Sequence, residues 1–292
     1  RLVRRPIQRM AWLFLLPTFA AFCIGFLYPF FKGAFLSFTS FKVTSQWTWA
    51  GFQNYIKAFS DDSFVHAFWF TAVFAVVTMI LINVLAFVTA YFLTKGIKGS
   101  NLFRTVFFMP NLIGGMVVGY IWSTIFDAIL VRYGTSILLN STYGFWGLVI
   151  LLCWQQIGYM MIIYIAGLQA IPEDMMEAAR IAGATPWQTL WNITIPNMMS
   201  SFTICMFLSL VNGFKLFDQN LALTEGRPFE QLANGDVVKK TEMLALNIYS
   251  AFYSGGGRNR GVGQAKAVVF FLLVAAIGLL QLQSTRKKEV QQ

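Results

Sequence analysis

Six long apolar runs dominate this sequence and limit the chain to a protein built from membrane-spanning helices. Each run is close to the roughly 20 residues that a helix needs to cross a bilayer. We place the spans at residues 11–32, 66–93, 104–126, 143–170, 198–223 and 263–283. They form one membrane domain, residues 11–285, between a basic head, residues 1–10, and a basic tail, residues 286–292. The sequence therefore predicts an all-α transmembrane fold with six spans.

The composition favours the same class. Hydrophobic residues make up 57% of the chain and charged residues only 12%, with a mean hydropathy of +0.61. These values lie outside the usual range of soluble domains. The net charge of +10 would indicate nucleic acid in a soluble protein, but here the basic residues flank the apolar runs. We therefore expect a membrane-lipid environment and no nucleic-acid partner.

The first apolar run follows several arginines, as the core of a signal peptide does. The run is too long for a signal peptide, and Phe22 before Cys23 spoils a lipoprotein-type cleavage site. We therefore keep it as a span. Pro17 and Pro29 are expected to kink or fray its helix.

The orientation follows from the basic residues beside the short connections. With the N-terminus in the cytoplasm, that side also receives the basic turn 95–104 and the basic tail. The connection 225–264 on the other side carries basic residues too, but long connections have less weight in setting topology. We predict that both termini are cytoplasmic and that this outer connection, with its Gly255–Gly257 run, is mobile.

The motifs of several enzyme classes are absent from the sequence. No Gly-x-x-x-x-Gly-Lys-Ser/Thr phosphate loop occurs, so we expect the chain to bind no ATP itself. His66 is the only histidine, which excludes His-Glu-x-x-His metal catalysis. The cysteines lie inside apolar runs without paired or metal-ligand spacing, and they are Cys23, Cys153 and Cys205. We predict no disulfide, no metal site and no enzyme.

A polar elbow, residues 172–196, separates the fourth and fifth spans and is predicted to form two short helices. Pro172 suits the first turn of a helix, which should end at Gly183. The stretch Thr185–Gln188 then has the N-cap, the proline and the glutamine of a capping box. Pro196 is expected to end this second helix before the next apolar run.

Two polar clusters lie inside the spans on either side of the elbow. The fourth span carries Gln155, Gln156 and Tyr159, and the fifth carries Ser209, Asn212, Gly213, Lys215 and Asp218. Polar residues at this depth are costly, so they are candidates for lining a solute path. Amides, hydroxyls and aromatic rings suit an uncharged, polyhydroxylated solute such as a sugar. The alternative is that these amides hydrogen-bond the helices to each other.

The elbow resembles the signature Glu-Ala-Ala, three residues, Gly, nine residues, Ile-x-Leu-Pro of the membrane subunits of bacterial ATP-driven importers. Glu177, Ala178, Ala179, Gly183, Ile193 and Pro196 match it, and Ile195 stands where leucine is usual. In that family the loop is cytoplasmic and docks into a cleft of the ATPase subunit. The resemblance therefore implies an ATPase-coupling contact at these matching residues.

The rest of the chain is similar to the maltose-type permease subunits of carbohydrate importers. The matching segments are Trp47 to Tyr55, Phe103-Arg104 with Pro110, Gly167 to Pro172, and Phe214 to Thr224. The family often has Thr-x-Gly-Gly-Pro after the fifth span, whereas Glu225-Gly226-Arg227-Pro228 follows Thr224 here. This departure leaves the conformation of that outer turn open.

The resemblance implies a type I importer permease with a coupling-helix elbow, in the bacterial cytoplasmic membrane. Its implied partners are a second permease, two ATPase subunits that hold ATP and Mg, and an extracytoplasmic sugar-binding protein. The implied mechanism is alternating access driven by ATPase closure. By alignment with the family, the sugar site maps to Gln155, Gln156, Tyr159, Ser209, Asn212, Gly213 and Leu216.

Two alternatives remain open from the sequence. An ion-coupled secondary carrier would use Asp127, Lys215 and Asp218 as its coupling charges. The same type of importer would instead carry glycerol phosphate or another polar metabolite, and Lys215 favours an anion. The elbow argues against the secondary carrier.

Overall fold

The computed structural model describes residues 4–253 and 260–286. The Gly255–Gly257 run and the tail beyond Arg286 lie outside the described residues, as do the side chains of residues 4–12. The chain divides into two compact units, formed by Arg1–Asp61 with Ile248–Phe270 and by Asp62–Asn247 with Phe271–Gln292.

The first unit contains a continuous apolar helical stretch, Leu13–Leu36, that is long enough to cross a membrane. It consists of α1 (Arg4–Phe22), the π-helix η1 (Cys23–Leu27) and α2 (Tyr28–Leu36). The π-turn comes just before Pro29, which has no N–H and whose ring collides with the carbonyl of the preceding turn in a regular α-helix. The wider turn makes room for the ring, so the chain stays helical where the sequence predicts a kink or a frayed end.

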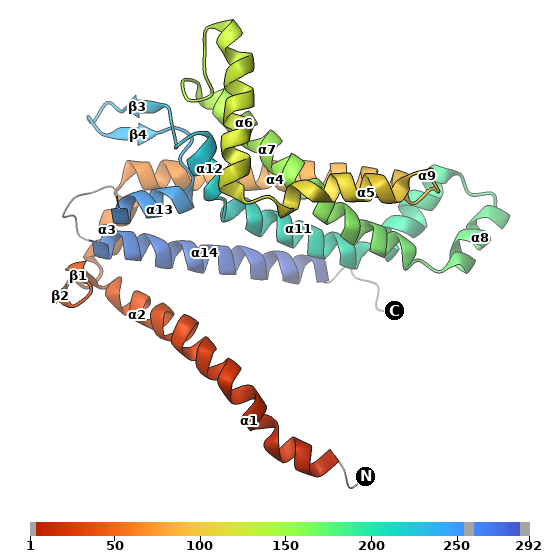
Figure 1. The fold of residues 1–292 in the computed structure, drawn as a ribbon, viewed down its shortest axis with the longest axis horizontal. Helices are drawn as coiled ribbons and strands as arrows, with labels where there is room; N and C mark the ends of the chain where they lie inside the picture. Colours follow the sequence, from red (N-terminus) through yellow and green to blue (C-terminus); the bar gives the residue numbers. More distant parts are fainter. Residues whose placement is uncertain (1–3, 254–259, 287–292) are drawn as a thin grey trace. The chain divides into compact units, whose positions relative to one another are not determined.

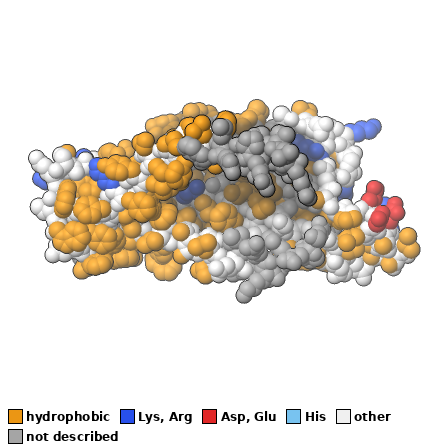
Figure 2. Space-filling model, turned by 90° about the horizontal axis from the view of Figure 1, so that it is seen from below, with side chains coloured by type: hydrophobic (Ala, Val, Ile, Leu, Met, Phe, Trp, Pro, Cys, Tyr) orange, Lys and Arg blue, Asp and Glu red, His pale blue; other side chains and the backbone are white. Residues whose placement is uncertain are grey.

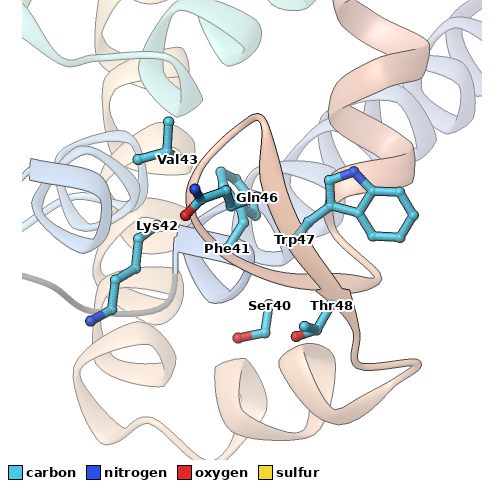
Figure 3. A pocket seen from close by; sticks show the side chains of 7 residues that line it. All are labelled: Ser40, Phe41, Lys42, Val43, Gln46, Trp47 and Thr48. Carbon is cyan, nitrogen blue, oxygen red and sulfur yellow. The ribbon is translucent and has the colours of Figure 1, made fainter.

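A small hairpin follows this helix. Strands β1 (Thr39–Val43) and β2 (Gln46–Trp49) are antiparallel, with Ser40 opposite Thr48. These two hydroxyl side chains point the same way and line a hollow on the hairpin (Figure 3). Helix α3 (Gln53–Phe59) comes next. Its buried Asn54 donates hydrogen bonds to the backbone carbonyls of Ser37 and Thr39, so the polar connection between the first two spans is an ordered piece of structure.

The second unit is built around three helices that pack on one another, α4 (Asp62–Leu93), α7 (Ser141–Gln169) and α11 (Met199–Phe214). Their buried faces share a core that includes Phe74, Ile82, Leu148, Leu151, Leu152, Met160, Tyr164 and Cys205. The apolar residues on the other faces of these helices remain exposed in the single chain, as expected of helices whose outer surface contacts lipid.

The third predicted span is divided in the structure. Helix α5 (Ser100–Phe108) and the 3₁₀ turn η2 (Met109–Leu112) precede α6 (Gly115–Leu130) and η3 (Val131–Tyr133). The break follows from Pro110, which cannot donate a helical hydrogen bond, and from the extended backbone at Ile113. Helices α5 and α6 therefore run in different directions (Figure 1). The apolar helix here covers Gly115–Tyr133, C-terminal to the predicted residues 104–126.

The elbow is helical on both sides of a turn. It consists of α8 (Glu173–Ile181), α9 (Pro186–Thr189), the π-helix η4 (Leu190–Thr194) and α10 (Ile195–Asn197). Pro196 lies inside α10, which ends one residue later at Asn197, so the second helix ends beside the proline as the sequence predicts. The helical path bends by 70° between α10 and α11.

The outer connection, which the sequence predicts to be mobile, contains regular secondary structure where the structure describes it. It holds the antiparallel strands β3 (Phe229–Gln231) and β4 (Val237–Lys239) and helix α13 (Leu244–Tyr253), and α12 (Asp218–Leu223) precedes it. Buried Asn220 fastens it, since its amide donates to Thr224 Oγ1 and to the Thr241 carbonyl and its oxygen accepts from Met243 N. The elbow and the β3–β4 hairpin lie at opposite ends of the second unit's helices (Figure 1).

Helix α14 (Arg260–Arg286) completes the described chain. Among the described residues, five helices are long and apolar enough to cross a membrane, and the bent pair Pro186–Asn197 and Met199–Phe214 makes a sixth. The prediction of an all-α transmembrane fold is confirmed. Its helices place the two predicted sites, the elbow and the polar clusters of α7 and α11, in the second unit.

Candidate functional site

The end of α8 is a Schellman motif, in which a left-handed residue lets the chain satisfy the last helical carbonyls. Ala184 N donates to the Ala179 carbonyl at 3.0 Å and Gly183 N to the Arg180 carbonyl at 3.0 Å. Gly183 has φ +72°, a conformation in which a side chain is strained, although a Cβ there would meet open space. Backbone conformation, not crowding within the chain, therefore requires glycine at this position.

The outer surface of α8 is exposed and chemically mixed. Glu177 and Ala178 are exposed, whereas Ala179 is buried against the chain. Ile181, at the end of the helix, is 89% exposed. No hydrogen bond or ion pair joins Glu177 to another described residue. Acidic side chains gather at the right-hand end of the surface in Figure 2, where α8 lies in Figure 1. A helix with free charges and an exposed isoleucine at its tip suits a contact with another protein.

The second arm of the elbow begins with the predicted capping box. Gln188 N donates to Thr185 Oγ1 at 3.3 Å, and Thr185 N donates to Gln188 Oε1 at 2.8 Å. Pro186 occupies the first helical turn. These reciprocal bonds fix where α9 starts, three residues after the left-handed Gly183 turns the chain.

A closed polar network joins α4, α7 and α11. The Tyr164 hydroxyl donates to Asn83 Oδ1 at 2.6 Å, and Asn83 Nδ2 donates to Ser209 Oγ at 2.8 Å. Asn83 Nδ2 also donates to the Met79 carbonyl, and Ser209 Oγ donates to the Cys205 carbonyl. All three side chains that form the network are buried. Because every strong polar group in it has a partner, the network holds the helices together and has no group left for a solute.

A second polar contact between α7 and α11 is open. Asn212 Nδ2 donates to Gln156 Oε1 at 3.1 Å, and both side chains are half-buried. Neither the Asn212 carbonyl oxygen nor the Gln156 amide nitrogen has another hydrogen-bond partner among the described residues. The pair therefore offers one acceptor and one donor beside accessible space, the combination that a hydroxyl group needs.

Gln155 is used differently from its neighbour Gln156. Its amide donates to the Ile113 carbonyl at 3.0 Å, and its oxygen accepts from Gln219 Nε2 at 2.7 Å. Gln155 thus ties α7 to the break before α6 and to α12. The broken third span leaves the Ile113 carbonyl outside a helix, and Gln155 satisfies it.

The remaining predicted path residues vary in exposure. Gly213 lies where α11 touches α4, since a Cβ on it would come within 2.9 Å of Ala75 Cα. Leu216 is buried, and Tyr159 is half-buried against the core. Lys215 is exposed at the end of α11. The structure therefore brings Gln156, Asn212 and Tyr159 to accessible positions on or beside the core and places the others in packing or at the rim.

The charges proposed for an ion-coupled carrier do not form a site. Asp127 accepts hydrogen bonds from Ser136 Oγ and Ile137 N, so it fixes the connection after α6. Lys215 and Asp218, both described, form no ion pair with each other. Outside the spans, Lys240 Nζ lies 2.7 Å from Glu230 Oε2 and lowers the pKa of that exposed carboxyl. This pair links the two strands of the outer hairpin.

Sequence reasoning missed Asn83, Tyr164 and Gln219. Asn83 and Tyr164 lie in the middle of predicted spans, so the cost of a polar side chain in hydrocarbon was a usable signal. Their partners were not predictable, because they depend on which faces of α4, α7 and α11 meet. Gln219 follows the fifth span and is found only through its bond to Gln155.

A conserved-domain comparison decides the family. Residues 82–287, which include both polar clusters and the whole elbow, match the model of the binding-protein-dependent transport system inner membrane component. The chain belongs to this family. It is therefore a permease subunit of an ATP-binding-cassette transport system, a multi-pass membrane protein and not an enzyme.

Individual relatives match along nearly the full length. The probable starch degradation products transport system permease protein AmyD of Thermoanaerobacterium thermosulfurigenes is 41% identical over 96% of this chain and 95% of its own length. The multiple sugar-binding transport system permease protein MsmF of Streptococcus mutans is 30% identical over 99% of both chains. A solved bacterial transporter for the import of alginate contains a chain with a TM-score of 0.79 and 20% identity, covering 98% of this chain and 99% of its own. That likeness confirms the importer-permease fold.

Proposed function

We propose that this permease carries a sugar or oligosaccharide into the cell by alternating access, driven by a separate ATPase that docks on α8. The observation that carries the coupling is the exposed surface of α8. This helix stands between two spans, ends in the Gly183 turn and exposes Glu177, Ala178 and Ile181, with no hydrogen bond or ion pair from Glu177 to another described residue. A movement of α8 passes through α9 and α10 to the bend at Met198 and so reaches α11, which carries half of the open polar pair.

The chemistry of the open pair supports an uncharged solute. Gln156 and Asn212 offer a free donor and a free acceptor and no charge, and Tyr159 lies one helical turn from Gln156. Relatives named for starch degradation products and multiple sugars point to the same class. The exposed, unpaired Lys215 is the one observation that favours the alternative, an anionic metabolite such as glycerol phosphate.

The proposed assembly has four further components and a defined orientation. They are a second permease, two ATPase subunits that hold ATP and Mg, and an extracytoplasmic sugar-binding protein. The elbow faces the ATPases, so both termini are cytoplasmic and the β3–β4 hairpin is outside. The placement of the elbow and the hairpin at opposite ends of the same helices supports this orientation.

A pull-down from mild detergent tests the coupling. The tagged wild type is compared with Glu177→Lys and Gly183→Asp, which alter the exposed surface and the turn of α8. We expect the ATPase to co-purify with the wild type and to be lost from both variants. Lys57→Glu, a charge reversal on exposed α3, is the matched control and should retain the ATPase.

Two outcomes would contradict ATPase coupling through α8. If the wild-type protein purifies alone and moves solute into liposomes without ATP, the ATPase-driven mechanism is wrong. If both elbow variants keep the ATPase and full transport, coupling takes place somewhere other than α8.

A further inference from the structure

The second arm of the elbow differs from the first in having no charge. We call the helical segment Pro186–Asn197, formed by α9, η4 and α10, the aromatic arm. No Asp, Glu, Lys, Arg or His occurs between Arg180 and Lys215. Helix α11 accounts for 16 residues of this stretch, about 24 Å of helix, which is most of the roughly 30 Å hydrocarbon thickness. The aromatic arm is thus an uncharged continuation of α11, which by itself is slightly shorter than a full span.

The direction of the aromatic arm fits the plane of a membrane. It makes an angle of 70° with α11. If α11 runs along the bilayer normal, the arm lies about 20° from the membrane plane, since 90° − 70° leaves 20°. An ordinary span tilt of about 20° still keeps the arm far from the normal. With α11 near the normal, the arm therefore begins close to the edge of the hydrocarbon and runs along the membrane surface.

One face of the arm carries two tryptophans. Trp187 is 67% exposed and Trp191 is 52% exposed. Their rings meet edge to face with centroids 5.6 Å apart, so they share one side of the helix. Leu190 and Ile193 are half-buried and Thr194 is buried, so the arm is held to the chain through its other side. Tryptophan is enriched at the level of lipid headgroups, where its ring is apolar and its N–H reaches water.

We infer that the aromatic arm lies in the headgroup layer of the bilayer, with Trp187 and Trp191 inserted at its boundary with the acyl chains. The partner is the phospholipid surface itself, because the arm continues a membrane span, carries no charge and exposes its indoles on one face. The adjoining α8 has three acidic residues, Glu173, Asp174 and Glu177, and does not suit that layer. An anchored arm keeps the bend at Met198 at a fixed depth while α8 remains free in water.

The depth of a spin label tests this inference without any ATPase. The three cysteines are replaced by alanine, and a nitroxide is attached at Trp191→Cys or, as the matched control on the other arm, at Glu177→Cys. The full chain is reconstituted in vesicles of phosphatidylethanolamine and phosphatidylglycerol. Collision with oxygen, which concentrates in lipid, is then compared with collision with a water-soluble nickel chelate.

We expect the ratio of oxygen to nickel collisions to be several-fold higher for the label at Trp191→Cys than for the label at Glu177→Cys. The inference is overturned if the two labels are equally accessible to nickel. It is also overturned if the label at Trp191→Cys becomes protected only when ATPase or a second permease is added, since the arm would then be a protein contact. Trp187→Cys repeats the test on the same face if Trp191→Cys does not fold. Because lipid alone is the partner, a failure of ATPase docking does not affect the outcome.

Discussion

The closed network and the open pair both link α7 to α11, and they differ in how many of their polar groups already have hydrogen-bond partners. In the closed network, Tyr164, Asn83 and Ser209 are buried and all have partners. In the open pair, Gln156 and Asn212 share a single hydrogen bond and are half-exposed. Polar residues inside a span can therefore serve helix packing or solute binding. The two roles are distinguished by whether all the hydrogen-bonding groups already have partners. The closed network fixes the packing of α4, α7 and α11, and the open pair is the better candidate for a solute site.

The largest expected effect is on the close contact between α4 and α11 at Gly213. Gly213 follows Asn212, and a Cβ there would lie 2.9 Å from Ala75 Cα of α4. We expect Gly213→Val to push α4 and α11 apart at a cost of about 3 kcal/mol. Thermal unfolding in detergent, followed by the loss of monodisperse protein, measures this. Gly25→Val is the control, because a Cβ at Gly25 meets no atom within 4 Å. Equal stability of the two variants would contradict the close helix contact.

The next largest effect is expected for Asn83→Leu, which should lower stability without lowering transport. Asn83→Leu removes the centre of the closed network, the acceptor of the Tyr164 hydroxyl and the donor to Ser209 Oγ. We expect it to reduce the free energy of unfolding by about 2 kcal/mol, while transport per folded molecule stays near that of the wild type. Thr89→Val is the control, since the one side-chain hydrogen bond of Thr89 among the described residues goes to the Leu85 carbonyl of its own helix. A stable Asn83→Leu protein that no longer transports would instead make the network part of the path.

The elbow was largely predictable from the sequence, and the roles of the polar residues were not. The Gly183 turn and the Thr185–Gln188 capping box depend on residues only a few positions apart, so local rules are enough to find them. Ser209 was predicted to line the path and lies in the closed network. The difference arises because the side of α11 that faces α4 is set by tertiary packing, which a single sequence does not contain.

Prolines account for much of the remaining difference in the fold. The chain stays helical through Pro29, where the π-helix η1 precedes the ring, whereas the helix that holds Pro196 ends one residue later at Asn197, as predicted. The rule that proline ends a helix also holds at Pro110, where the third predicted span breaks. The residue type is the same in all three places. The proline alone does not set the outcome, since α1 also continues through Pro17 with no π-turn before it.

A smaller effect is expected at the open pair itself. Asn212→Ala removes one of the two groups that a solute hydroxyl would bind, at a position that is already half-exposed. We expect kcat/KM for uptake of a labelled malto-oligosaccharide by reconstituted vesicles to fall by about tenfold, equivalent to about 1.4 kcal/mol. The unfolding temperature should remain close to that of the wild type. Gln156→Ala should lower kcat/KM by a similar factor. In the double variant, the loss of transition-state free energy should be smaller than the sum of the two single losses.

A loss of stability without a loss of transport in Asn212→Ala would contradict the assignment of the open pair as a solute site. If Asn212→Ala lowers stability as much as Asn83→Leu does and leaves kcat/KM unchanged, the open pair is another helix contact and the solute path lies elsewhere. Glycerol phosphate uptake that depends on Lys215 and not on Asn212 would favour the anionic solute instead.

The smallest expected effect tests how much one bond of the closed network contributes. Tyr164→Phe keeps the buried ring against Phe87 and Phe202 and removes only the hydroxyl that donates to Asn83 Oδ1. Hydrogen bonds between membrane helices contribute about 0.6 kcal/mol on average, so we expect a loss of that order in thermal unfolding and no change in transport. Combined with Asn83→Leu, the Phe substitution should add nothing, because the oxygen that the hydroxyl binds is already gone. Additive losses in the double variant would mean that the Tyr164 hydroxyl stabilises the bundle through a partner other than Asn83.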